Sequence, residues 1–212
     1  IIRVYKINSL PLYGDELTIV YDSYSVLKTG MDQTGQFLPL TFKMGAGRPA
    51  GYVYGSIPFV YAFGPSVWGV RDLSFASGMG IIILMYFLGK KMFNEKVGLM
   101  SSLLASASLW DIYLSRAGFE AHFALFLTLF GVVMFLYKKY ILMAFLFGLA
   151  IFTYPTFKLT IPLLFLILIF FSGFVTTLKN KYFLAALSIL VIFAGFSLKE
   201  TINGVSDDRF FN

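Results

Sequence analysis

Two adjacent carboxylates, Asp15 and Glu16, begin a polar and aromatic stretch that precedes an almost wholly apolar chain. A carboxylate beside a substrate can accept the proton of an attacking hydroxyl or amine, which is general-base chemistry. Solvated loop acids are the simpler alternative for such a pair. The placement of the other charges decides between the two interpretations.

The composition indicates a membrane protein. Of 212 residues, 58% are hydrophobic and only 13% are charged, against about 25% in a typical soluble domain. A mean hydropathy of +0.78 leaves too few polar residues to cover a soluble surface. The chain has no cysteine and one histidine, which excludes thiolate metal sites and disfavours a His-based zinc site. The net charge of +6 comes with no nucleic-acid-binding motif, so we expect no nucleic-acid partner.

The apolar runs predict an all-α membrane protein, a polytopic bundle with about six transmembrane helices. The expected spans are Leu73–Gly89, Val97–Trp110 continued to Leu114, Ala121–Tyr137, Tyr140–Phe157, Leu159–Leu178 and Tyr182–Leu198. We expect a single transmembrane domain over residues 1–212, truncated at both ends. Residues 11–64 would form a long first loop, 66–198 the helices, and 199–212 the start of the next loop.

The first loop is expected to carry a short amphipathic helix over Asp15–Leu27. Its apolar face recurs at three- and four-residue spacing, over Leu17, Val20, Tyr21, Tyr24 and Leu27. Repeated glycines and prolines predict irregular loop from Gly30 to Gly64.

The short loops predict the orientation of the bundle. Alternate turns carry lysines, which by the positive-inside rule face the cytoplasm: Lys90, Lys91 and Lys96, then Lys138 and Lys139, then Lys179 and Lys181. Every acid except Glu95 then falls on the other side or at its membrane edge. The basic residues there are Lys43, Arg48, Arg71, Arg116, Lys158 and Arg209. Mixed charges gathered at one mouth of a bundle suggest a functional site.

The order of the outer motifs resembles a known family. The acidic pair is followed by GRPAGYVYGSIPFVYAFGPS, VWGVRDLSFASG, LSRAGFEAHFALF and FTYPTFKLTIPL. This order is similar to the N-terminal part of GT-C-fold glycosyltransferases, in the protein O-mannosyltransferase and aminoarabinose-transferase group. The resemblance runs from Leu10 to Arg209.

The resemblance implies a multi-pass enzyme of the plasma membrane, with its active site on the non-cytoplasmic face. Its partners would be the lipid bilayer, a polyprenyl-phosphate-linked sugar donor, and a protein, lipid or glycan acceptor. No cofactor is implied with certainty, and a divalent metal ion stays open. Two alternatives are a transporter or flippase of lipid-linked substrates, and a non-catalytic membrane subunit. Transporters place charges near the bilayer midplane, whereas here they gather at one face.

The resemblance assigns roles to residues of the first two outer loops. Asp15 matches the family's catalytic aspartate, the general base. Glu16 would bind acceptor or metal, or orient Asp15. Arg116 and Glu120 match a Ser-Arg followed four residues later by an acid, and would bind substrate. An ordinary ion pair between positions i and i+4 of one helix is the structural alternative.

Residues near the third outer turn would contact the donor. Lys158 stands where the group has a cation that can hold the donor phosphate, and lipid snorkelling is its alternative. Tyr154 would stack on the sugar or belong to an aromatic belt. We interpret Arg71 and Asp72 as a neutralising structural pair, and His122 as an interfacial side chain hydrogen-bonded to backbone.

Overall fold

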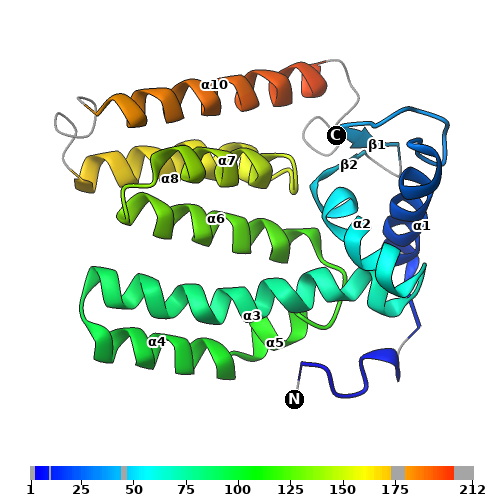
Figure 1. The fold of residues 1–212 in the computed structure, drawn as a ribbon, viewed down its shortest axis with the longest axis horizontal. Helices are drawn as coiled ribbons and strands as arrows, with labels where there is room; N and C mark the ends of the chain where they lie inside the picture. Colours follow the sequence, from blue (N-terminus) through cyan, green and yellow to red (C-terminus); the bar gives the residue numbers. More distant parts are fainter. Residues whose placement is uncertain (1–2, 10, 44–46, 173–179, 203–212) are drawn as a thin grey trace.

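The computed structural model describes residues 3–9, 11–43, 47–172 and 180–202. Its long helices lie side by side, and the elements of the first loop cover one end of them (Figure 1). The helices of this bundle are α3 (Val67–Met92), α4 (Glu95–Ala107), α6 (Glu120–Leu136), α7 (Tyr140–Ile151), α8 (Phe157–Ser172) and α10 (Lys181–Ile202). The expected helical class is therefore confirmed.

The number of membrane spans stays a prediction. Only α3 and the Lys181–Glu200 part of α10 are long and apolar enough to cross a membrane, among the residues described. Helices α6, α7 and α8 are apolar but shorter, at 10–17 residues. The expected span Leu159–Leu178 runs into residues 173–179, which lie outside the described part of the chain.

The expected second span is divided at Ser108. Helix α4 ends at Ala107, and the short helix α5 (Leu109–Leu114) begins one residue later. Ser108 has an extended backbone conformation, and its hydroxyl accepts a hydrogen bond from the backbone N–H of Asp111. A serine in this position caps the helix that follows, so the apolar run forms two helices.

The core of the bundle is aromatic and tightly packed. Helix α6 packs on α7, and α7 packs on α10. Met143, Phe147 and Phe183 are fully buried there. A Cβ atom at Gly131 would lie 2.4 Å from the ring of Phe147, so glycine is what allows α6 and α7 to approach this closely.

The connections alternate between the two ends of the bundle, as expected. The α3–α4 and α6–α7 connections lie at the end opposite the first loop, whereas the α5–α6 and α7–α8 connections lie beside it (Figure 1). Lys90 and Lys91 are in the last turn of α3, at the end far from Asp15.

The expected helix of the first loop is present as α1 (Gly14–Thr29), but only part of its expected apolar face is buried: Val20 belongs to the core and Leu27 packs against it, whereas the other three residues are exposed. Leu17 and Tyr21 are 52% and 59% exposed. The buried side is half polar and half apolar, with Glu16, Ile19, Val20, Asp22, Ser23 and Val26. This side is buried because its polar groups find partners: the Ser23 hydroxyl, for example, donates to the carbonyl of Val53 at 3.0 Å.

The expected irregular loop from Gly30 to Gly64 was also wrong in its second half. It contains a two-stranded antiparallel sheet of β1 (Thr41–Phe42) and β2 (Arg48–Pro49) and the helix α2 (Gly51–Phe63). The glycines that indicated a loop serve close packing. A Cβ at Gly55 would lie 2.9 Å from the side chain of Leu73. Tertiary packing therefore outweighs the low helix propensity of glycine and of Pro58.

Candidate active site

Arg48 on β2 connects the first loop to the bundle. Its Nη2 lies 3.0 Å from Oδ1 of Asp15, and its Nε lies 2.6 Å from Oε1 of Glu120. Nη1 donates to the hydroxyl of Thr18 at 2.6 Å and to the carbonyl of Asp15 at 3.1 Å. One guanidinium thus holds two carboxylates that are 105 positions apart in the sequence.

The two carboxylates differ in exposure. The side chain of Asp15 is 76% exposed, whereas that of Glu120 is 20% exposed and that of Arg48 is 10% exposed. Asp15 lies in the first turn of α1, and Glu120 begins α6. Helix N-termini favour negative charge, so both helices support carboxylates at this place. Asp15 is held in position and can still meet a substrate.

Glu16 lies in a different environment from its neighbour. It is fully buried, and its carboxylate receives hydrogen bonds from Arg71, from Nε at 2.8 Å and from Nη2 at 2.6 Å. The backbone N–H of Gly118 donates to it at 2.7 Å. Both oxygens are therefore occupied inside the protein. This position favours the alternative that Glu16 orients Asp15 over the alternative that it binds acceptor or metal.

Arg71 does not form the expected structural pair with Asp72. Its ion pair is with Glu16, and its guanidinium also donates to the carbonyls of Ile7 at 2.7 Å and Pro11 at 3.2 Å. The arginine therefore anchors both the segment before α1 and α1 itself to helix α3.

Arg116 and Glu120 do not share a helix. Helix α5 ends at Leu114 and α6 begins at Glu120, so Arg116 lies in the connection between them. The alternative of an ordinary ion pair along one helix therefore has the wrong geometry. Glu120 pairs with Arg48, and Arg116 lines a separate cavity.

That cavity, here called the basic cavity, has a volume of about 600 Å³. It lies between the segment before α1 and the α5–α6 connection. Its walls include the basic residues Lys6, Arg71 and Arg116 and the aromatic residues Tyr13, Tyr113 and Phe119. Burial raises the pKa of Tyr13, and the charges of Glu16, Asp15 and Glu120 raise it further. The Tyr13 hydroxyl therefore shares the environment of these carboxylates.

A second cavity of about 610 Å³, here called the apolar cavity, lies on the other side of the first loop. Its walls come from α2, α6, α7 and α10 and include Tyr54, Phe123, Phe152 and Phe193. The backbone N–H of Gly51 donates to the carbonyl of Phe152 at 2.8 Å, so the α7–α8 turn rests directly on the start of α2.

Tyr154 and Lys158 belong to this α7–α8 region. Tyr154 follows Thr153, which lines the apolar cavity. The ring of Tyr154 lies edge-on to the ring of Phe157, with 6.3 Å between the ring centroids. Lys158 is in the first turn of α8. The predicted site residues thus form two groups, one around Arg48 and the basic cavity, and one beside the apolar cavity.

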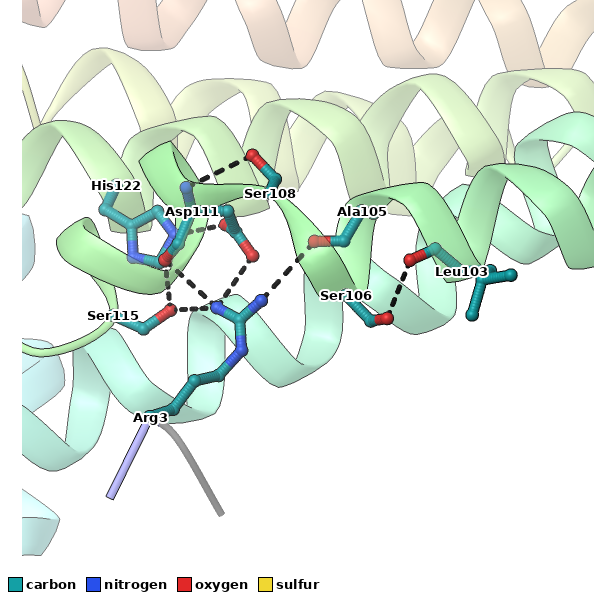
Figure 2. A network of polar contacts seen from close by, with 8 residues as sticks. All are labelled: Arg3, Leu103, Ala105, Ser106, Ser108, Asp111, Ser115 and His122. Atoms are coloured by element: carbon teal, nitrogen blue, oxygen red, sulfur yellow. Dashed lines mark hydrogen bonds and ion pairs between the residues drawn. The ribbon is translucent and has the colours of Figure 1, made fainter. Parts of the chain in front are cut away.

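His122 is fully buried, and its side-chain partner is not the expected backbone group. Its Nε2 lies 2.8 Å from Oδ1 of Asp111, while Nη1 of Arg3 lies 2.8 Å from Oδ2 of the same carboxylate (Figure 2). Arg3 also donates to the hydroxyl of Ser115 and to the carbonyl of Asp111 (Figure 2). This cluster fastens the N-terminal segment to α5 and α6.

The residues around Asp15 do not fit a metal ion well. A cation between Asp15 and Glu16 would displace Arg48 from one carboxylate and Arg71 from the other. Among the described residues, no group of three or more histidine, aspartate or glutamate side chains gathers as metal ligands. We therefore derive no step through a metal.

Sequence reasoning missed Arg48 as the centre of the site and Arg3 as an anchor. Arg48 follows Gly47, which has a φ of 82°, and precedes Pro49. A basic residue between two residues of restricted or unusual backbone is a signal that could have indicated a fixed side chain. Asp207, Asp208 and Arg209 lie outside the described residues.

A family model described as dolichyl-phosphate-mannose-protein mannosyltransferase matches residues 56–198, more than half of the chain. The chain belongs to this family. It is therefore a membrane glycosyltransferase in general terms, and the expected likeness to mannosyltransferases is confirmed. The match begins after Asp15, Glu16 and Arg48, so their roles rest on geometry. No curated protein and no solved structure matches the chain.

Proposed function

We propose that this chain carries the general base and part of the donor site of a GT-C-type glycosyltransferase. The donor is a sugar linked to a polyprenyl phosphate. An acceptor hydroxyl or amine attacks the anomeric carbon, and the bond from that carbon to the phosphate oxygen breaks. Asp15 takes the proton of the acceptor, and the polyprenyl phosphate leaves with the bonding electron pair. General-base catalysis of this kind contributes ~10²–10⁴-fold to a rate.

The observation that carries this proposal is that the adjacent residues Asp15 and Glu16 differ in burial and in hydrogen bonding. Glu16 is buried and fully hydrogen-bonded, whereas Asp15 is exposed and held by Arg48 beside Glu120. A base must be accessible to the proton it removes and fixed in position. Among the acids of this outer group, Asp15 combines both properties.

The donor fits the other side of the first loop. The apolar cavity would hold the first isoprenoid units, because its walls are almost entirely apolar. Lys158, one turn beyond this wall, would stabilise the charge of the departing phosphate. Tyr154 would stack on the sugar. Glu16 would support the site through Arg71, and Glu120 would contact substrate beside Asp15.

The bundle geometry supports an active site on the non-cytoplasmic face of a plasma membrane. The lysine-bearing α3–α4 and α6–α7 connections lie at the end opposite the first loop (Figure 1). Lysine-rich short loops face the cytoplasm, which leaves Asp15 on the other face. Family membership favours this enzyme over a flippase or a non-catalytic subunit.

A sugar-transfer assay on the full-length protein tests the proposal. Asp15→Asn keeps the size of the side chain and removes its basicity, so turnover should fall ~10²–10⁴-fold at a normal protein level. Glu95→Gln, an exposed acid at the opposite end, is the matched control and should keep wild-type turnover. Transfer by Asp15→Asn at the wild-type rate would refute the assignment.

A further inference from the structure

A third cavity, here called the lysine pocket, lies at the end of the bundle opposite the first loop and has a volume of about 530 Å³. Lys138 and Lys139, in the short connection between α6 and α7, line one side of it. Tyr182 lines the other side, because α10 begins at this same end of the bundle (Figure 1). The rest of the lining comes from the first turns of α7 and consists of Tyr140, Ile141, Leu142 and Phe145. The proposed transfer reaction uses none of these residues.

The two lysines carry positive charge that is not balanced at the pocket. No aspartate or glutamate is among the lining residues. Within the described part of the chain, neither ammonium group makes an ion pair. The only described acid at this end of the bundle is Glu95, which lies 3.5 Å from Lys90. The described lysines at this end are Lys90, Lys91, Lys96, Lys138, Lys139 and Lys181. The pocket therefore suits an anion.

The backbone fixes the turn that carries the two lysines. Lys138 has a φ of 58°, in the left-handed region that glycine or asparagine usually occupies where a helix ends. Its N–H donates to the carbonyl of Phe135 at 2.9 Å, and the N–H of Lys139 donates to the carbonyl of Met134 at 2.9 Å. These bonds close the end of α6, so both lysines stand at the pocket on a fixed turn. A lysine is less favourable than glycine in this conformation, which favours a role for its ammonium group.

An apolar surface continues from the lysines along α7. Ile141, Leu142 and Phe145 line the pocket, and each side chain is about half exposed. Phe145 also packs on α10, where its ring lies edge-on to the ring of Phe193 with 5.7 Å between the centroids. One continuous pocket thus has a cationic end and an apolar end.

Two tyrosines lie at the cationic end of the pocket. Tyr140 is 8% exposed, and its ring lies edge-on to the ring of Phe183 with 5.4 Å between the centroids, so α7 and α10 are in contact there. Tyr182 is exposed, and Nζ of Lys181 lies 5.1 Å from the centroid of its ring. Tyrosine is enriched at the level of lipid headgroups, because its ring is apolar and its hydroxyl is polar. The cationic end therefore fits the headgroup layer, where a lipid phosphate meets its hydrocarbon chains.

We infer that the lysine pocket binds one anionic phospholipid. The phosphate lies against the ammonium groups of Lys138 and Lys139, and one acyl chain lies on Ile141, Leu142 and Phe145. Basic pockets between helices at a membrane surface suit anionic headgroups. This lipid contacts both α7 and α10 at the end far from the proposed base, so it is not a substrate of the transfer reaction. The inference does not depend on the proposed function.

Photocrosslinking of the full-length protein in nanodiscs tests the inference. The bilayer is dioleoyl phosphatidylcholine with a small fraction of phosphatidylglycerol that carries a photoreactive diazirine in one acyl chain. Mass spectrometry of the digested protein should find the label enriched on residues 140–145 and on Tyr182. Replacing part of the phosphatidylcholine by unlabelled phosphatidylglycerol should suppress this label. Replacing the same part by phosphatidylethanolamine, which has no net charge, should not. Added inorganic phosphate should not suppress the label either, because it has no chain to occupy the apolar end.

Variants separate a specific site from general attraction to a basic surface. The double variant Lys138→Gly with Lys139→Gln removes both charges, and glycine keeps the left-handed backbone. Its label at the pocket should fall about tenfold or more, since each lysine beside an anionic lipid contributes roughly fivefold. Lys138→Arg with Lys139→Arg keeps both charges and should keep the label. The matched control, Lys90→Gln with Lys96→Gln, removes the same charge from the same end outside the pocket and should match wild type.

Four results would overturn the inference. An equal loss of label in the matched control would show that only the total charge of this end attracts the lipid. Suppression by phosphatidylethanolamine as strong as by phosphatidylglycerol would show that the pocket does not select charge. Suppression by inorganic phosphate would assign the lysines to a free anion. A label spread evenly over the helices, with no enrichment at residues 140–145 and Tyr182, would show that no lipid site exists there.

Discussion

Arg48 donates from Nε to Oε1 of Glu120 at 2.6 Å, and this ion pair joins the first loop to the start of α6. The same guanidinium reaches Asp15 at 3.0 Å through Nη2. Arginine can bind two carboxylates at once because its donors form a rigid planar fork. The arrangement places the proposed base at a fixed distance from the bundle, although Asp15 itself is exposed.

Arg48 is therefore expected to act as a positioning residue. Arg48→Gln should lower kcat about 100-fold, since a displacement of about 1 Å at a reacting group can cost this much. The donor KM should change little, because Arg48 does not line the apolar cavity. Arg48→Lys keeps the charge but cannot make all four contacts, so it should recover only part of the rate. Initial rates at varied donor concentration measure this, and a wild-type kcat in Arg48→Gln would contradict the role.

Glu16 and Arg71 should matter for stability. Both side chains are almost completely buried, and removal of one partner leaves a buried charge without compensation. Glu16→Gln should lower the free energy of unfolding by ~3–5 kcal/mol. Thermal unfolding of the purified protein checks this, with Glu95→Gln as the control.

The double variant Glu16→Leu with Arg71→Met refines the test. Replacing a buried ion pair by apolar groups of similar size is often close to neutral, so the double variant should be more stable than Glu16→Gln. A stable Glu16→Gln with a raised substrate KM would show instead that Glu16 contacts substrate.

Asp22 should make stability depend on pH. Burial raises the pKa of its carboxyl, and the nearby charge of Asp32 adds to this shift. A raised folded pKa means that the folded state holds the proton more tightly, so this contribution is present at low pH and is lost as the pH rises through the folded pKa. Asp22→Asn, which is neutral at every pH, should be at least as stable as wild type at pH 7. Unfolding curves between pH 4 and pH 7 should be flatter in the variant, and a steeper curve would contradict the prediction.

The orientation can be checked by cysteine labelling in intact cells. Asp15 and Lys139 are both exposed and lie at opposite ends of the bundle. A membrane-impermeant thiol reagent should label Asp15→Cys from outside and should not label Lys139→Cys. The reverse pattern would invert the proposed topology.

The sequence predicted the parts of the fold that depend on local composition. Uninterrupted apolar runs indicated the helices near Leu73–Gly89 and Tyr182–Leu198, because such runs have no other stable form in a membrane. The sequence prediction failed at α2, where Gly51, Gly55 and Pro58 indicate a loop locally. Only the packing of this segment against α1 and α3 explains the helix.

The sequence predicted individual residues of the candidate site but not the ion pairs that join them. The sequence indicates both Asp15 and Glu120, but the residue that joins them, Arg48, lies 33 positions from Asp15 and 72 from Glu120. The sequence also could not predict that Asp15 is exposed while Glu16 is buried. Adjacent residues of a helix point about 100° apart, and only the tertiary fold decides which of the two meets Arg71.

Gly51 gives the fold a direct mechanical link between the α7–α8 turn and the strand that carries Arg48. A Cβ at this position would lie 2.8 Å from the Cα of Thr153, so the two backbones touch with no side chain to absorb a shift. Gly51 is three residues from Arg48, and Thr153 is on the wall of the apolar cavity. A displacement of the α7–α8 turn would therefore be passed to β2, whose Arg48 holds Asp15.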